Sequence, residues 1–144
     1  NGTMETLIDT LERSGIEVLY DETVTVQDQL TLIGRKDRSD RKRLPLEALM
    51  NGVDLSKPVI LLEHQPYELD RAQQLGIDLM VSGHTHRGQV FPGSLITSRI
   101  YENDWGYVQK EGLHSIVTSG FGFWGPPIRI GTRSEVVDIH VNFE

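Results

Sequence analysis

The stretch PVILLEHQPYELDRAQQLGIDLMVS, residues 58–82, decides the fold. It begins with an apolar run at 58–63 and ends with a second at 77–82, and both have the length and composition of buried strands. Between them, residues 68–75 place apolar side chains at helical spacing. Strands joined through a helix lie parallel in one sheet, so this order predicts a parallel pair buried on both faces and an α/β fold.

The residues before this stretch predict a helix, a strand and a hairpin. Residues 3–14 are amphipathic with a helical period, and residues 16–20 form a short apolar run suited to a strand. Residues 23–26 and 30–34 flank a turn and predict an antiparallel hairpin.

A dense charge run, RKDRSDRKR, occupies residues 35–43 and has no apolar face. We interpret it as a mobile, solvated loop, and the alternative is a contact with anionic lipid headgroups. Pro45 follows and opens a predicted short helix that reaches Met50.

Glycine, proline, serine and aromatic residues dominate after residue 83, and short strands recur around a turn at Glu111-Gly112. This part predicts antiparallel pairing. Residues 135–143 alternate apolar and polar side chains and predict a last strand.

Composition excludes several classes of protein. The 144 residues suit one domain, and 14 basic against 21 acidic side chains give a formal net charge of −7. An acidic chain lacks the positive surface of a general nucleic-acid binder. Cysteine is absent, which excludes thiol nucleophiles and cysteine zinc sites, and no apolar run is long enough to cross a membrane.

Histidines follow both predicted parallel strands. His64 comes directly after the first, and His84 and His86 lie in SGHTHRGQVF, residues 82–91, after the second. Parallel strands end at the same edge of a sheet, so three imidazoles from two loops are expected to converge there. Neutral imidazole binds zinc, iron and manganese, and the cluster predicts a metal site.

These motifs resemble the calcineurin-like metallophosphoesterases. The family's ordered motifs end in a lone His on a strand end and then Gly-His-x-His, as in His64 and Gly83-His84-Thr85-His86. The match is closest to a membrane-associated or secreted bacterial branch, through Gly88-Gln89 and a later segment rich in glycine and aromatic residues. This branch implies that the intact protein is membrane-associated or secreted. Arg87 replaces a small residue of the family pattern, and we expect its guanidinium fork to bind a substrate phosphate.

The resemblance implies a metal-dependent phosphoesterase that hydrolyses phosphomonoesters or phosphodiesters with two divalent ions of manganese, zinc or iron. His86 would serve one ion, and His64 with His84 the other. It also implies a four-layer αββα sandwich in which two sheets pack face to face. The catalytic acid–base groups stay unassigned.

The family's earlier motifs, Asp-x-His, Gly-Asp-x-x-Asp and Gly-Asn-His, do not occur in these 144 residues. We therefore expect the chain to be the C-terminal half of the domain and inactive alone, because three neutral imidazoles supply no negative charge for two repelling cations. Its partner would be the N-terminal half, or a second copy that covers an exposed sheet edge. The alternative is a non-catalytic module that binds at most one metal ion.

Overall fold

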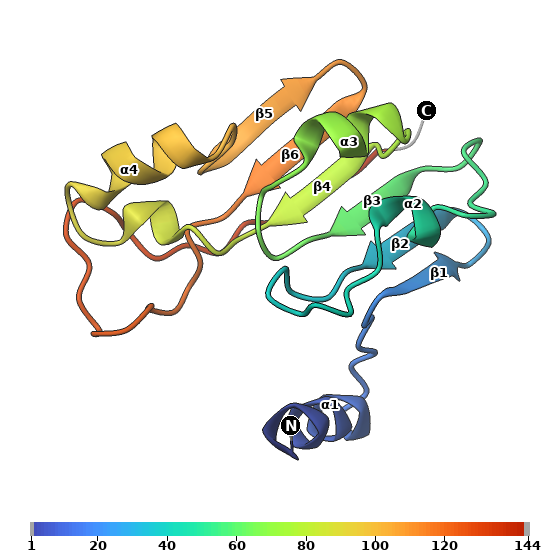
Figure 1. Ribbon diagram of the computed structural model, residues 1–144, viewed down its shortest axis with the longest axis horizontal. Coiled ribbons are helices and arrows are strands. Elements are labelled where there is room, and N and C mark those ends of the chain that lie inside the picture. The colour runs from blue at the N-terminus through green and yellow to red at the C-terminus, as the bar shows by residue number, and fades with distance from the viewer. Residues whose placement is uncertain (1, 143–144) are drawn as a thin grey trace.

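The computed structural model describes residues 2–142, and its centre is one six-stranded sheet in the order β1-β2-β3-β4-β6-β5 (Figure 1). The strands are β1 (Glu22–Val26), β2 (Leu30–Gly34), β3 (Val59–Leu62), β4 (Leu79–Ser82), β5 (Gly106–Lys110) and β6 (Leu113–Val117). Neighbours from β2 to β6 are parallel, and β1 and β5 are antiparallel at the two edges. The predicted α/β class, the parallel pair and both hairpins are confirmed.

Five helical segments accompany the sheet: α1 (Gly2–Arg13), α2 (Leu46–Leu49), α3 (Leu69–Gln74), the 3-10 turn η1 (His86–Gly88) and α4 (Gly93–Ile100). The helices α2 and α3 lie over one face of the sheet, while α1 projects away beyond β1 (Figure 1). The core lies between that face and the two helices. Its fully buried members include Ile33, Leu46, Leu61, Ile77 and Met80.

The opposite face of the sheet is apolar but lacks a helical layer. Leu62, Val81 and Ile116 are register neighbours across β3, β4 and β6 on that face. Leu62 is 41% exposed. Leu62 and Val81 line a groove that runs on to Leu32 and Val24. The second sheet of the expected four-layer sandwich is not found among residues 2–142.

Two predicted strands are wrong. Residues 16–20 are not in a strand, because no described segment offers them a ladder partner. Residues 135–142 are also irregular, and residue 143 lies outside the described part of the chain. Val137 and Ile139 line a groove with Val81 and Ile116 on the open face. They pair with no strand of the sheet, in which β6 already has β4 and β5 on its two sides.

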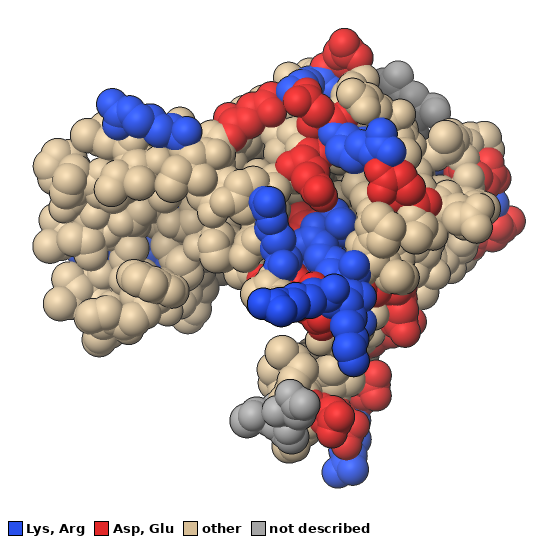
Figure 2. Space-filling model, in the orientation of Figure 1, with Lys and Arg blue, Asp and Glu red and all other residues tan. Residues whose placement is uncertain are grey.

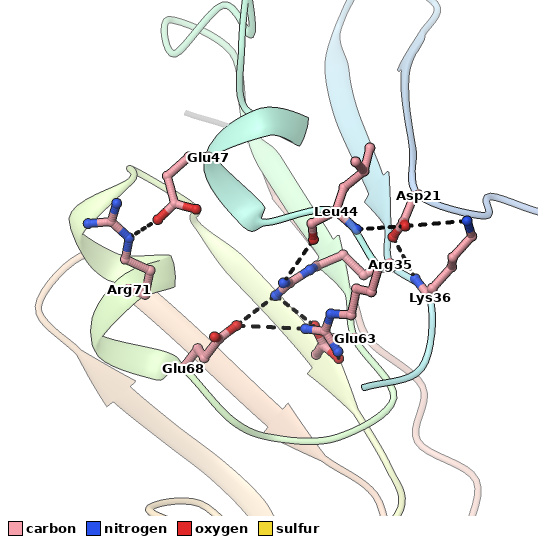
Figure 3. Close-up of polar contacts among 9 residues, drawn as sticks. Asp21, Arg35, Lys36, Leu44, Glu47, Glu63, Glu68 and Arg71 are labelled. Atoms are coloured by element: carbon pink, nitrogen blue, oxygen red, sulfur yellow. Dashed lines mark hydrogen bonds and ion pairs between the residues drawn. The ribbon is translucent and has the colours of Figure 1, made fainter. Parts of the chain in front are cut away.

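Asp21 ties the start of β1 to residues 36–44 (Figure 3). Its carboxylate accepts hydrogen bonds from the backbone N–H groups of Lys36 and Leu44, each at 2.9 Å. Burial opposes ionisation, but these bonds and the Lys36 charge outweigh it and hold the pKa of Asp21 below its usual 3.8. Because this pKa is lower in the folded than in the unfolded chain, the carboxylate stabilises the fold above that pH, and the stabilisation is lost as the pH falls.

We expect Asp21→Asn to lower the free energy of unfolding by about 1–3 kcal/mol at pH 7, because the amide keeps the shape but not the charge-assisted hydrogen bonds. The loss should be smaller at pH 2 than at pH 7, because falling pH protonates the wild-type carboxyl and removes its charge as well. Urea denaturation at both pH values measures the difference. An equal loss at the two pH values would contradict the role of the charge.

Candidate functional site

His64 and His84 lie at the carboxyl ends of the neighbouring strands β3 and β4. The Gly83 N–H donates to the His64 carbonyl at 3.1 Å and joins the two loops. The His84 Nδ1 and His64 Nε2 atoms are 3.1 Å apart, with the rings nearly perpendicular at 83°. The sequence placed these imidazoles at one sheet edge, and the structure brings the pair into contact.

The loop that carries His84 and His86 is strained. His84, His86, Arg87 and Gln89 all have φ between 43° and 68°, the left-handed region that residues other than glycine rarely adopt. At Gly88, where φ is 73°, an added Cβ would lie within 2.1 Å of the Gly93 backbone. Strain of this kind persists only where the surroundings enforce it, and it concentrates at functional sites.

Arg129 fixes His86 against the segment of residues 119–125. Its Nη2 atom donates to the carbonyls of Ser119, Gly120 and Gly122 at 2.9, 3.1 and 2.7 Å, and lies 3.3 Å from the His86 Nδ1. The Gln89 side chain adds two hydrogen bonds to the Trp124 backbone, at 2.6 and 2.7 Å. The glycine-rich segment is therefore packed onto the histidine loop.

Burial lowers the pKa values of both His84 and His86. For His84 the second cause is the neighbouring His64, and for His86 it is the Arg129 charge. The two rings therefore stay neutral to a lower pH than an ordinary histidine. Only neutral imidazole has a lone pair to offer a metal ion.

The imidazoles of this cluster are suitable ligands for a metal ion, but the cluster does not provide a complete set of ligands. Two ring nitrogens face each other, and the Asp37 carboxylate is close enough for both rings to lower its pKa, after the larger effect of Ser39 hydrogen bonds. No group of three or more His, Asp or Glu side chains within residues 2–142 is arranged to hold an ion. The assignment of His64, His84 and His86 as ligands stays a prediction.

Arg87 stacks on the Trp105 ring, with its guanidinium carbon 3.7 Å from the ring centre. It lines a groove with Ser119, Thr132 and Arg133. None of the ion pairs among the described residues involves Arg87. Its expected role at a substrate phosphate stays a prediction.

The charge run at residues 35–43 is folded back onto the sheet, so its interpretation as a wholly solvated loop is wrong. The Glu63 carboxylate accepts from Arg43 Nη1 and Nη2 at 3.0 and 2.6 Å and from Arg35 Nη1 at 3.1 Å (Figure 3). Glu68 adds a contact to Arg35 at 2.8 Å. The side chains of Glu63, Arg35 and Arg43 are 1%, 5% and 10% exposed.

This ion cluster borders the candidate site, because Glu63 directly precedes His64. Burial raises the pKa of Glu63, and the Arg43 and Arg35 charges oppose that rise. The cluster holds residues 35–43 against the strand end, where Arg38 stacks on Tyr67 and Asp37 meets the Gln65 side chain at 3.4 Å. The sequence did contain a signal for this ion cluster: a carboxylate at the end of an apolar strand, together with a run of arginines.

Sequence comparison finds related metallophosphoesterases. An uncharacterized metallophosphoesterase of Aquifex aeolicus (strain VF5) is 38% identical over 143 residues, which cover 93% of this chain and 54% of the relative. A transmembrane protein with metallophosphoesterase domain of Danio rerio is 35% identical, over 90% of this chain and 33% of its own. An uncharacterized metallophosphoesterase of Helicobacter pylori (strain J99 / ATCC 700824) is 34% identical, over 92% and 37%.

These similarities, with the α/β sheet and its strand-end histidines, show that the chain belongs to the calcineurin-like metallophosphoesterase superfamily. The chain spans between a third and about half of the length of these relatives. No family model matches it, and no solved structure matches it significantly. None of the helices within residues 2–142 has the length and apolar character needed to span a membrane.

Proposed function

We propose that the complete protein hydrolyses phosphomonoesters or phosphodiesters with a dinuclear metal centre, and that His64, His84 and His86 are ligands. The observation that carries the proposal is the contact of His64 with His84 at the ends of adjacent parallel strands. Bound divalent manganese, zinc or iron ions would lower the pKa of water and neutralise charge on the phosphoryl oxygens.

The chain's own residues would bind and orient. His64 and His84 bring two ring nitrogens within 3.1 Å of each other, and the Ser119 carbonyl accepts a hydrogen bond that fixes the orientation of the His86 ring. Partners of this kind on the far side of a ligating histidine set which nitrogen is free for a metal. Arg87, held on Trp105, would pair its guanidinium with the phosphate of the substrate.

Charge balance supports a further partner. Two divalent ions need carboxylate ligands, and the histidine set provides none. We infer that the N-terminal half of the domain supplies them and that its sheet covers the open face formed by Leu62, Val81 and Ile116. A second copy of this chain is the other candidate for covering an exposed part of the sheet.

The second candidate function is a non-catalytic module that binds at most one ion. It is favoured by the arrangement of the described residues, in which two imidazoles meet and no third side chain completes a metal-binding group.

Metal analysis separates the two functions. We expect the full-length protein to contain about two metal ions per chain and to hydrolyse bis-p-nitrophenyl phosphate with added manganese, while these 144 residues alone stay inactive. Elemental analysis after dialysis and release of p-nitrophenol measure both. A full-length protein with one ion or none and no hydrolysis would favour the non-catalytic module.

A further inference from the structure

An apolar lobe extends from the histidine loop. We define it as residues 88–101, which include α4, together with residues 119–131, and the two segments are joined through the Gln89 side chain. Its large side chains point outward rather than into a core. Those at least half exposed are Phe91, Leu95, Ile96, Ile100, Phe121, Phe123, Trp124, Ile128 and Ile130, with Phe121 at 78% and Trp124 at 73%.

Charge is almost absent from this lobe. Its two segments contain no Asp, Glu or Lys, and Arg99 and Arg129 are their only charged residues. Arg129 is bound inside the lobe by backbone carbonyls. Figure 2 shows the lobe as an almost uninterrupted tan surface, whereas a quarter of the whole chain is charged. An exposed patch of this extent marks an interaction surface.

Cations border the lobe. The loop of residues 35–43 lies near the lobe, because Arg38 stacks on Tyr67 and the Tyr67 ring is 4.8 Å from the ring of Tyr101 in the lobe. Blue side chains gather at the centre of the face drawn in Figure 2. Arg38, Arg41 and Lys42 on this loop are exposed. Within residues 2–142 the ion pairs involve none of these three. A local positive patch in a chain of net charge −7 indicates an anionic partner.

We propose that the apolar lobe and the cations beside it form a docking surface for an anionic lipid bilayer. Phe and Trp side chains at the lobe's tip enter the interface between headgroups and acyl chains, and Arg38, Arg41 and Lys42 face the lipid phosphates. The lobe lies on the surface of the bilayer, as interfacial elements do, and does not cross it.

The charges favour a bilayer over a second copy of the chain. A two-fold contact puts the same surface of both copies face to face, so it would bring the two sets of exposed cations to one interface without acidic partners. An anionic bilayer instead satisfies the apolar side chains and the cations together.

This surface goes beyond the proposed hydrolysis and does not depend on a bound metal ion. Docking through this surface would also determine where the candidate site lies relative to the bilayer, because the lobe begins two residues after His86. Docking would hold the His64 and His84 pair beside the headgroup layer.

Vesicle sedimentation of the 144-residue chain tests the proposal in chelator, so that metal binding plays no part. We expect it to sediment with phosphatidylcholine vesicles that contain 30% phosphatidylglycerol, and tryptophan emission to shift to shorter wavelength. Phe121→Ser/Trp124→Ser should reduce vesicle binding at least tenfold, and Arg41→Gln/Lys42→Gln should reduce it about 25-fold at low salt, or roughly fivefold for each charge removed. The control is Leu55→Ser, which removes a 60% exposed apolar side chain near the opposite end of β3.

Three results would overturn the proposal: no sedimentation of the wild type, an equal loss of binding in Leu55→Ser, or a concentration-dependent dimer in analytical ultracentrifugation that Phe121→Ser/Trp124→Ser abolishes while vesicles leave it intact. Failure of hydrolysis in the full-length protein would leave vesicle binding unchanged, so the two proposals fail separately.

Discussion

Glu63→Gln is expected to lower the free energy of unfolding by about 3–5 kcal/mol, the cost of removing one partner from a buried ion pair. The carboxylate is 1% exposed and accepts from the arginines at residues 35 and 43. The neutral amide of the variant would leave both guanidinium groups largely buried, without the carboxylate charge that now balances them. Glu68, half exposed, would compensate for only part of the loss.

Chemical denaturation at pH 7 measures this effect, and Glu47→Gln is its matched control. Glu47 also pairs with an arginine, Arg71, but both side chains are over 40% exposed (Figure 3). Exposed pairs contribute at most about 1 kcal/mol. Equal losses in the two variants would show that the buried cluster contributes no more than a surface pair.

The centre of the fold was predictable because its signal is local. The order of β3, α3 and β4 follows from two apolar runs and a helical period within 25 residues, and parallel strands joined through a helix allow one arrangement. The hairpins followed in the same way from turns between short strands. In each of these segments, the residues that form the element also determine its partner.

Features that depend on distant residues were missed. The cations at residues 35 and 43 find their carboxylate 28 and 20 residues away, at Glu63, so the charge run by itself indicated a solvated loop. Residues 135–142 have the alternation of a strand but join no strand of the sheet; β6, whose Ile116 they lie near, already has β4 and β5 on its two sides. Periodicity reports which side is apolar and not which edge is free.

The site was predictable in part for the same reason. Strand ends brought His64 and His84 together, as parallel pairing requires. Two features were not predictable: the left-handed conformations of His84, His86, Arg87 and Gln89, and the Arg129 contact to His86. Both depend on packing between the loop and residues 119–131. Loop conformation is set by such contacts and not by the spacing of histidines.

His84→Ala in the full-length protein is expected to weaken metal binding by at least about 100-fold, since even changes to residues behind a ligand cost 10- to 100-fold. Hydrolysis of bis-p-nitrophenyl phosphate should fall in parallel. The free energy of unfolding should change by less than about 1 kcal/mol, because His84 is only partly buried and lies outside the core, with ring contacts to His64 and Tyr101. Metal titration, initial rates and denaturation of one preparation measure all three quantities.

His140→Ala is the matched control, because it removes an imidazole that is 83% exposed and paired only with Asp138 among the described residues. It should leave the metal content and the rate unchanged. If His84→Ala keeps its full metal content, the histidine is not a ligand. If it loses metal and stability together, the loop has collapsed, and His86→Ala then decides, because Arg129 still donates to the backbone carbonyl of residue 86 and the Gln89 side chain still binds the Trp124 backbone. Full metal content in both variants would refute the histidine site altogether.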